Sequence, residues 1–138
     1  MTGAVTRSGG DRPWIRIGLV WAGVSGCVAV AAGAYATHGV GDVQGAAWMT
    51  TASGYQLWHA LALLGVVLAA GRRPGWPDRL LGLAGVCFGL GSLLFCGALY
   101  TLALIGAGPL TALAPVGGTL LMLGWLAVAA SALAPSRR

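Results

Sequence analysis

Residues 48–64, WMTTASGYQLWHALALL, begin with hydroxyl-bearing side chains and continue as an apolar segment up to Gly71. A membrane helix needs about 20 residues at 1.5 Å each to cross a hydrocarbon core about 30 Å thick. Residues 55–70 alone are too short for that crossing, so the helix must begin near residues 47–51. This start places His59 near the middle of the bilayer and Gln56 about one turn nearer the outside.

Charged residues are rare in this chain and are confined to a few places. They make up 8% of the 138 residues, and hydrophobic residues make up 57%. Soluble domains have about a quarter charged residues. All eight basic residues are arginines, and none falls within residues 17–71 or 80–136. A net charge of +5 distributed in this way marks membrane boundaries rather than a basic face for nucleic acid. The composition therefore predicts a protein of the lipid bilayer with no nucleic-acid partner.

The arginine-free segments predict an all-α fold, an integral membrane four-helix bundle formed by a single domain at residues 14–134. We expect its helices at about residues 15–37, 47–70, 80–105 and 111–134. Residues 1–13 are expected to be a disordered tail, and residues 135–138 a basic tail. Asp78, which follows Pro77, is expected to cap the N-terminus of the third helix.

The arginines also predict the orientation of the helices. The arginine-bearing segments are the start of the chain, residues 72–79 and the C-terminal end, and four helices of alternating direction bring all three to one side. Short loops rich in arginine remain in the cytoplasm. Both termini are therefore expected on the cytoplasmic side of the cell (inner) membrane, with His38 and Asp42 in an outer loop.

Small residues are expected to hold the helices together, because lipid provides little hydrophobic drive for helix association. The chain has 24 glycines, and several lie at three- or four-residue spacing within a predicted helix. The predicted packing positions are Gly18, Ala22, Gly26, Gly82, Gly85, Gly89, Gly117 and Gly118.

A few polar side chains fall at similar depth in the predicted helices and form a candidate polar layer. Gln56 and His59 are three residues apart and therefore lie along one side of a helix. The predicted layer comprises Ser25, Gln56, His59, Ser92, Cys96, Tyr100 and Thr119. Histidine can exchange a proton near neutral pH, so one interpretation is a site for protons or a small solute. The other is structural, with a neutral His59 that donates a hydrogen bond to a hydroxyl or backbone carbonyl between helices.

The sequence indicates no catalytic residues, no metal site and no cofactor. Cys27, Cys87 and Cys96 are isolated in apolar segments, without the CxxC spacing of metal or redox pairs. His38 and His59 are expected at different depths, which argues against joint ligation of a haem. Asp42 lies in the outer loop with no nucleophile motif near it, so the chain is not expected to be an enzyme.

Four short blocks of the sequence resemble a known family. Residues 36–39 (ATHG) are similar to a G-A-H-G motif, and residues 48–62 to W-x-T-A-x-x-Y-Q-x-x-H-A-L-A, although the four residues Thr51-Ala52-Ser53-Gly54 intervene here between the threonine and the tyrosine. Residues 94–100 (LFCGALY) resemble L-F-S-G-S-L-Y, and residues 114–125, which contain APVGG and GW, resemble T-P-I-G-G and G-W. Over residues 17–130 the chain thus resembles the domain-of-unknown-function family 423, the YgdD-like small membrane proteins that include the eukaryotic transmembrane protein 256.

The resemblance implies a four-helix membrane protein and brings no established activity. Several family residues are replaced here: Cys96 and Ala98 stand in place of two serines, Ala114 in place of a threonine, and Thr37 in place of an alanine. A serine-based polar pathway would have fewer hydroxyls in this chain, which weakens the transport interpretation.

Two functional hypotheses follow from these observations. The first is a structural, accessory or oligomerising subunit that acts through contacts with the lipid bilayer, with another membrane protein or with its own copies. The alternative is a channel- or transporter-like protein that moves protons or a small solute past His59 and Gln56.

Overall fold

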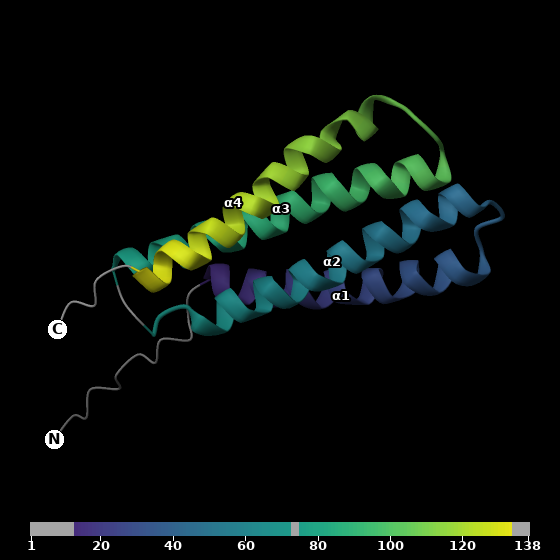
Figure 1. Ribbon diagram of the computed structural model, residues 1–138. Helices are drawn as coiled ribbons and strands as arrows, with labels where there is room; N and C mark the ends of the chain where they lie inside the picture. The colour runs from purple at the N-terminus through teal and green to yellow at the C-terminus, as the bar shows by residue number, and fades with distance from the viewer. Residues whose placement is uncertain (1–12, 73–74, 134–138) are drawn as a thin grey trace, which may run out of the picture.

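The computed structural model describes residues 13–72 and 75–133, and within these ranges the chain forms four long α-helices (Figure 1). They are α1 (Pro13–His38), α2 (Val43–Ala69), α3 (Trp76–Leu104) and α4 (Ala114–Leu133), with a short 3-10 helix, η1 (Pro109–Leu113), before α4. The all-α fold class predicted from the sequence is confirmed. The predicted tails lie outside the described residues, apart from Pro13, which begins α1.

All four helices are long and apolar enough to cross a membrane. The shortest span, η1 together with α4, has 25 residues, and the longest, α3, has 29. At 1.5 Å per residue in an α-helix, 25 residues extend about 38 Å, which exceeds the hydrocarbon core of about 30 Å. The described chain therefore has four membrane spans, as the distribution of arginines predicts.

The helices α2 and α3 each begin four residues earlier than expected from the sequence, at Val43 and Trp76. For α2 the reason is an N-cap: the Asp42 carboxylate accepts a 2.7 Å hydrogen bond from the Gly45 N–H and satisfies a free donor of the first turn. For α3 the predicted cap is wrong. Gly75 occupies the cap position, and Asp78 lies inside the first turn, where a carboxylate is favourable near the helix N-terminus.

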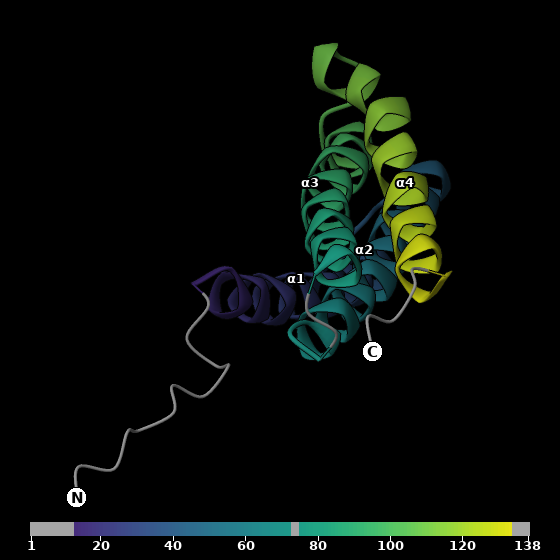
Figure 2. The same ribbon diagram turned by 90° about the vertical axis from the view of Figure 1, so that its left-hand side faces the viewer.

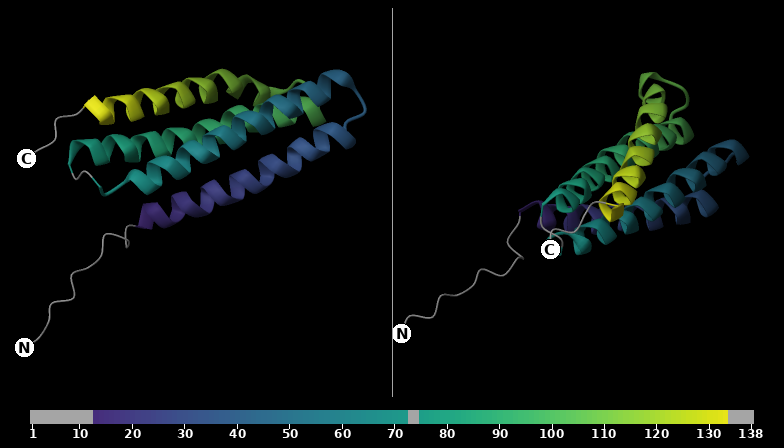
Figure 3. Two further views of the ribbon diagram at one scale, coloured as in Figure 1. Left: turned by 60° about the horizontal axis from the view of Figure 1, so that its bottom comes forward. Right: turned by 60° about the vertical axis from the view of Figure 1, so that its left-hand side comes forward.

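The helices pack mainly against their neighbours in sequence, α1 with α2, α2 with α3 and α3 with α4. Figure 2 shows α1 set apart from α3 and α4, with α2 beside it. In both views of Figure 3, α1 begins and α4 ends at the same end of the bundle. This arrangement agrees with four alternating spans, and the side of the membrane that this end faces stays a prediction.

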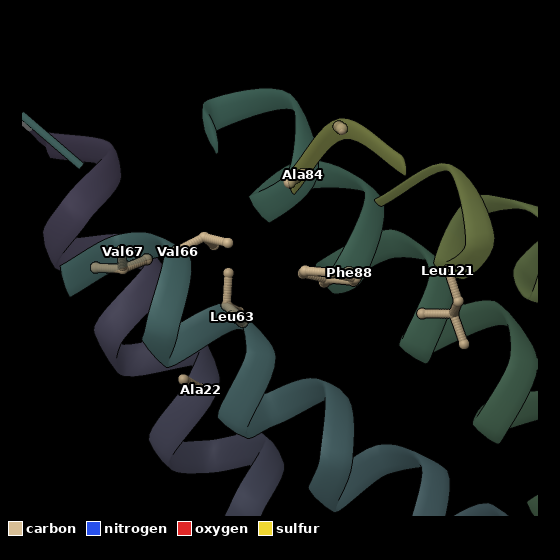
Figure 4. Close-up of a cluster of buried hydrophobic side chains, with 8 residues drawn as sticks. Ala22, Leu63, Val66, Val67, Ala84, Phe88 and Leu121 are labelled. Carbon is tan, nitrogen blue, oxygen red and sulfur yellow. The ribbon is translucent and has the colours of Figure 1, made fainter. Parts of the chain in front are cut away.

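The apolar core lies where α2 meets its neighbours. Its buried members come from all four helices, and Phe88 of α3, only 1% exposed, is the largest of them. Figure 4 shows Phe88 between Leu63 of α2 and Leu121 of α4. A second cluster of Ala52, Cys96 and Leu99 joins α2 to α3 on the side of the predicted outer loops.

Among the described glycines, Gly117 of α4 lies closest to the backbone of another helix, α3. A Cβ at Gly117 would lie 2.8 Å from the Cα of Phe95 and 2.9 Å from the carbonyl oxygen of Gly91, both backbone atoms of α3. A Cβ at Gly118, the next residue, would meet only ring atoms of Phe95 at 3.7 Å or more. Gly117 is therefore the position at which a side chain cannot be accommodated without moving a helix.

The other predicted packing positions divide into two groups. Gly18 lies against Val67, Ala22 is buried, and Gly85 and Gly89 have ordinary contacts with neighbouring side chains. The prediction is wrong for Gly26 and Gly82, where a Cβ would meet no atom within 4 Å. Two tight positions were missed, Gly91 against Leu121 and Gly124 against Phe88.

Candidate functional site

Gln56 lies at the centre of α2 and joins three helices by hydrogen bonds. Its amide Nε2 donates to the Ser25 hydroxyl of α1 at 3.2 Å, and its Oε1 accepts from the Tyr100 hydroxyl of α3 at 2.6 Å. Since α1 and α3 have few direct contacts, this amide is the main polar link between them. Three members of the predicted polar layer, Ser25, Gln56 and Tyr100, are therefore brought together.

A cavity of about 260 Å³ lies beside this hydrogen-bonded group, between α1 and α3. Its polar lining comes from Ser25, Gln56, Ser92, Cys96 and Tyr100, and its apolar lining includes Trp21, Val24, Val28 and Leu93. Ser25, Gln56 and Ser92 all lie near the midpoints of their helices, so the cavity is far from both ends of the bundle. Five of the seven predicted residues thus line one intramembrane cavity.

Ser92 differs from the other hydroxyls near this cavity because it has no partner. The residue is 5% exposed, and its Oγ makes no hydrogen bond within the described part of the chain. A serine inside a helix usually bonds to a carbonyl of the preceding turn, as Ser53 and Ser131 do here. A buried hydroxyl without a partner is unfavourable, so Ser92 is the least satisfied polar group of the site.

His59 has partners different from those of Gln56. The residue is 6% exposed and packs against Phe88 of α3 and Trp125 of α4, with ring centroids 5.7 and 6.2 Å away. Its Nδ1 lies 2.7 Å from the Tyr55 carbonyl oxygen, and its Nε2 lies 3.3 Å from the indole Nε1 of Trp125. His59 thus links α2 to α4, two helices that have little other contact.

These two hydrogen bonds assign the proton on the imidazole. A carbonyl can only accept, so Nδ1 must carry the hydrogen, and the Trp125 N–H can only donate, so Nε2 must be unprotonated. His59 is therefore the neutral Nδ1–H tautomer, assigned from the hydrogen-bond network. The carbonyl that it binds belongs to its own helix, whereas the sequence suggested a partner between helices.

The remaining predicted residues stand apart from the cavity. The Thr119 hydroxyl donates to the Pro115 carbonyl of its own helix, and the residue is exposed. His38 is the exposed last residue of α1, and Asp42 is the N-cap of α2. The role of Trp125 as a donor to His59 was missed, because a tryptophan in an apolar run carries no signal of its partner.

The chemistry available in this region is that of neutral groups. The charged residues of the described chain, Arg16, Asp42, Arg72, Asp78 and Arg79, all lie in the turns or in the first turn of a helix. Within the same residues, no three His, Cys, Asp or Glu side chains gather where a metal ion could bind. The arrangement offers hydroxyl, amide and thiol groups in an otherwise apolar setting.

Comparison with known proteins finds one family and several similar membrane proteins. The family described as "Protein of unknown function (DUF423)" matches residues 32–118. A UPF0382 inner membrane protein YgdD of Escherichia coli is 35% identical over 89% of this chain and 94% of its own length. UPF0382 membrane proteins of Haemophilus influenzae (35% over 80% and 89%) and Staphylococcus epidermidis (32% over 81% and 91%) are also similar.

No solved structure matches the chain. The four spans and the names of the relatives make this a multi-pass protein of the inner membrane. Because the family match covers more than half of the chain and the relatives align over most of their lengths, the chain belongs to the DUF423 family of membrane proteins, whose function is unknown.

Proposed function

We propose that this protein is a non-catalytic accessory subunit that acts through contacts inside the bilayer, with another membrane protein or with further copies of itself. The observation that carries the proposal is that both ring nitrogens of His59 are engaged in hydrogen bonds within the protein. A proton relay must accept a proton on one side and release it on the other. His59 has no free nitrogen for either step.

The distribution of polar and apolar side chains supports the same proposal. Gln56 and His59 direct their polar atoms toward neighbouring helices, where each such bond stabilises the bundle by about 0.6–1.7 kcal/mol. All four helices carry exposed large apolar side chains, and Val20, Leu61, Leu83 and Met122 are each more than half exposed. Such surfaces suit lipid or the helices of another membrane protein.

The transport hypothesis requires that Gln56 and His59 act on one path. In the described chain no hydrogen bond joins them, and their partners lie on different helices. A proton would also have to displace the Trp125 N–H from Nε2 before it could bind there. These features favour the accessory role over proton movement past His59.

A flux measurement separates the two hypotheses. We expect liposomes that contain the wild-type protein to show the proton leak of protein-free liposomes, measured with an internal pH-sensitive dye. His59→Phe should give the same leak, and Trp125→Phe serves as a milder variant that keeps the imidazole. A wild-type flux that disappears in either variant, while elution in mild detergent is unchanged, would overturn the proposal.

A second measurement tests for contacts with a partner. A photo-crosslinking amino acid placed at Val20, Leu61, Leu83 or Met122 is expected to form a protein adduct from at least one helix in intact membranes. Ala84, which is fully buried, is the matched control and should yield only crosslinks within the chain. The accessory role is refuted when none of the four exposed positions forms an adduct with a protein.

A further inference from the structure

Two adjoining cavities form a groove between α1 and α3. The first is the polar cavity of about 260 Å³ beside Gln56 and Ser92. The second, of about 330 Å³, lies nearer the start of α1 and is lined by Trp14, Leu63, Val67 and Val86. Trp21 lines both cavities, so they meet at this side chain. The groove thus has a polar half at the middle of the helices and an apolar half beside it.

The unpartnered hydroxyl of Ser92 indicates that the polar half receives a hydrogen-bonding group. Ser92 is 5% exposed and lines this cavity, and its Oγ is covered and has no partner in the described chain. A ligand group in the cavity reaches this hydroxyl after a rotation of the serine side chain about χ1. The neighbouring Gln56 has both amide atoms engaged and still offers one further N–H, since its Nε2 carries two hydrogens. A ligand oxygen placed between the two residues can accept a hydrogen bond from the free N–H of Gln56. The same ligand group can donate to the Ser92 hydroxyl or accept from it.

The charge of the groove limits the kind of ligand. No charged side chain lines either cavity, and the polar half lies far from the helix ends. Asp78 and Arg79 line a third cavity that adjoins the apolar half at Trp14, so these charges lie at the end of the groove away from Ser92. A phosphate or carboxylate here would lose its hydration without gaining a counter-charge, which strongly disfavours it. The head of the ligand is therefore uncharged.

The apolar half limits the remainder of the ligand. Gly85 and Gly89 form its α3 wall, where a Cβ would only touch Leu63 at 3.5 Å and Trp21 at 3.6 Å. These glycines add no side chain of their own to the wall, and the other α3 residues that line it, Val86 and Leu90, are apolar, so the surface suits a hydrocarbon chain. A hydrocarbon alone would leave Ser92 without a partner, and a small polar solute would gain nothing from the apolar half.

We propose that the groove binds an uncharged amphiphile, with a hydroxyl or carbonyl head beside Ser92 and Gln56 and a linear hydrocarbon chain that passes Trp21 along Gly89 and Gly85. Such a ligand satisfies the serine hydroxyl and fills both cavities. The site does not include His59, so it is independent of the argument for an accessory role.

The probe for this site is hexadecan-1-ol with a diazirine in its chain, added to the purified full-length protein in nanodiscs. Light should attach it to the peptides that contain Trp21 and Val86. Unlabelled hexadecan-1-ol should compete at least about tenfold better than hexadecane, which has no head group, or palmitate, which is charged.

Two pairs of variants complete the test. Ser92→Ala should weaken competition by hexadecan-1-ol about three- to tenfold, because one hydrogen bond is lost. Ser131→Ala is the matched control, since Ser131 is also buried and already bonds to its own helix. Gly89→Leu should abolish labelling by filling the apolar half, whereas Gly65→Leu, at an open position of α2, should leave it unchanged.

The proposal is overturned if hexadecane or palmitate competes as well as the alcohol, or if Ser92→Ala and Ser131→Ala behave alike. It is also overturned if a crosslinker at Val86 captures a protein while hexadecan-1-ol leaves the groove unlabelled. None of these outcomes depends on proton flux or on crosslinks from the other helix faces. Failure of this proposal is therefore distinguishable from failure of the accessory role.

Discussion

Replacing Gly117 by alanine is expected to destabilise the contact between α3 and α4, whereas the same change at Gly118 is expected to be tolerated. Both glycines lie in the first turns of α4, and both changes add one methyl group. The new methyl at position 117 would meet backbone atoms of Phe95 and Gly91 at 2.9 Å or less. At position 118 it would meet only the Phe95 ring, at ordinary contact distance.

The magnitude follows from two opposing terms. Replacing a helical glycine by alanine stabilises a helix by about 0.5–1 kcal/mol, because less backbone entropy is lost on folding. Overpacking costs about 1–3 kcal/mol, and here the atoms that must move are backbone atoms, which cannot rotate away. Gly117→Ala should therefore lower the free energy of unfolding by about 0.5–2 kcal/mol, and Gly118→Ala should raise it by up to about 1 kcal/mol.

Thermal unfolding in mild detergent, followed by tryptophan fluorescence, is a suitable assay for this pair. The two variants have the same composition, so differences in detergent binding and in helix propensity largely cancel. The difference between their free energies of unfolding isolates the cost of the close approach. Equal stability of the two variants would show that α3 and α4 do not approach each other at Gly117 as described.

Three further predictions concern the ends and the polar links of the helices. Asp42→Ala should lower the free energy of unfolding by about 0.5–2 kcal/mol in the same assay, and Asp42→Asn, which keeps an accepting oxygen, should restore most of it. Tyr100→Phe should lower the free energy of unfolding by about 0.6–1.7 kcal/mol, because the side-chain carbonyl of Gln56 loses its hydrogen-bond donor. An unchanged melting temperature would contradict the 2.6 Å hydrogen bond between these two residues. A fluorescent protein fused to the C-terminus should fluoresce in cells, and alkaline phosphatase fused to the same end should be inactive, because we expect that end in the cytoplasm. The reverse pattern would contradict this placement.

The number and approximate position of the helices could be predicted because arginine is too costly to place within the hydrocarbon core. The same reasoning located the ends poorly. An apolar run marks only the part of a helix that lies in the hydrocarbon core, whereas the first turn of a helix can hold polar residues, as it does after Val43 and around Asp78. Capping by Asp42 adds a turn that hydropathy does not register.

The candidate site was predicted in part. Depth along the helices brought Ser25, Gln56 and Tyr100 to one level, and hydrogen bonds join them. Depth says nothing about rotation around a helix axis, so Thr119 was included although it bonds to its own helix. The prediction of which of the 24 glycines lie at helix–helix contacts has the same difficulty, because the spacing of glycines along a helix does not say which face of that helix meets a neighbour.

The placement of Gln56 and His59 on one helix has a consequence for biogenesis. Membrane helices leave the ribosome in order, and α2, which has the lowest mean hydropathy of the four spans, enters the bilayer when α1 is its only inserted neighbour. At that moment Ser25 can already receive the Gln56 amide, while Tyr100 and Trp125 have yet to be synthesised. The indole that completes the pairing of His59 arrives with the last helix, so α2 acquires its full set of partners only when translation of α4 is finished.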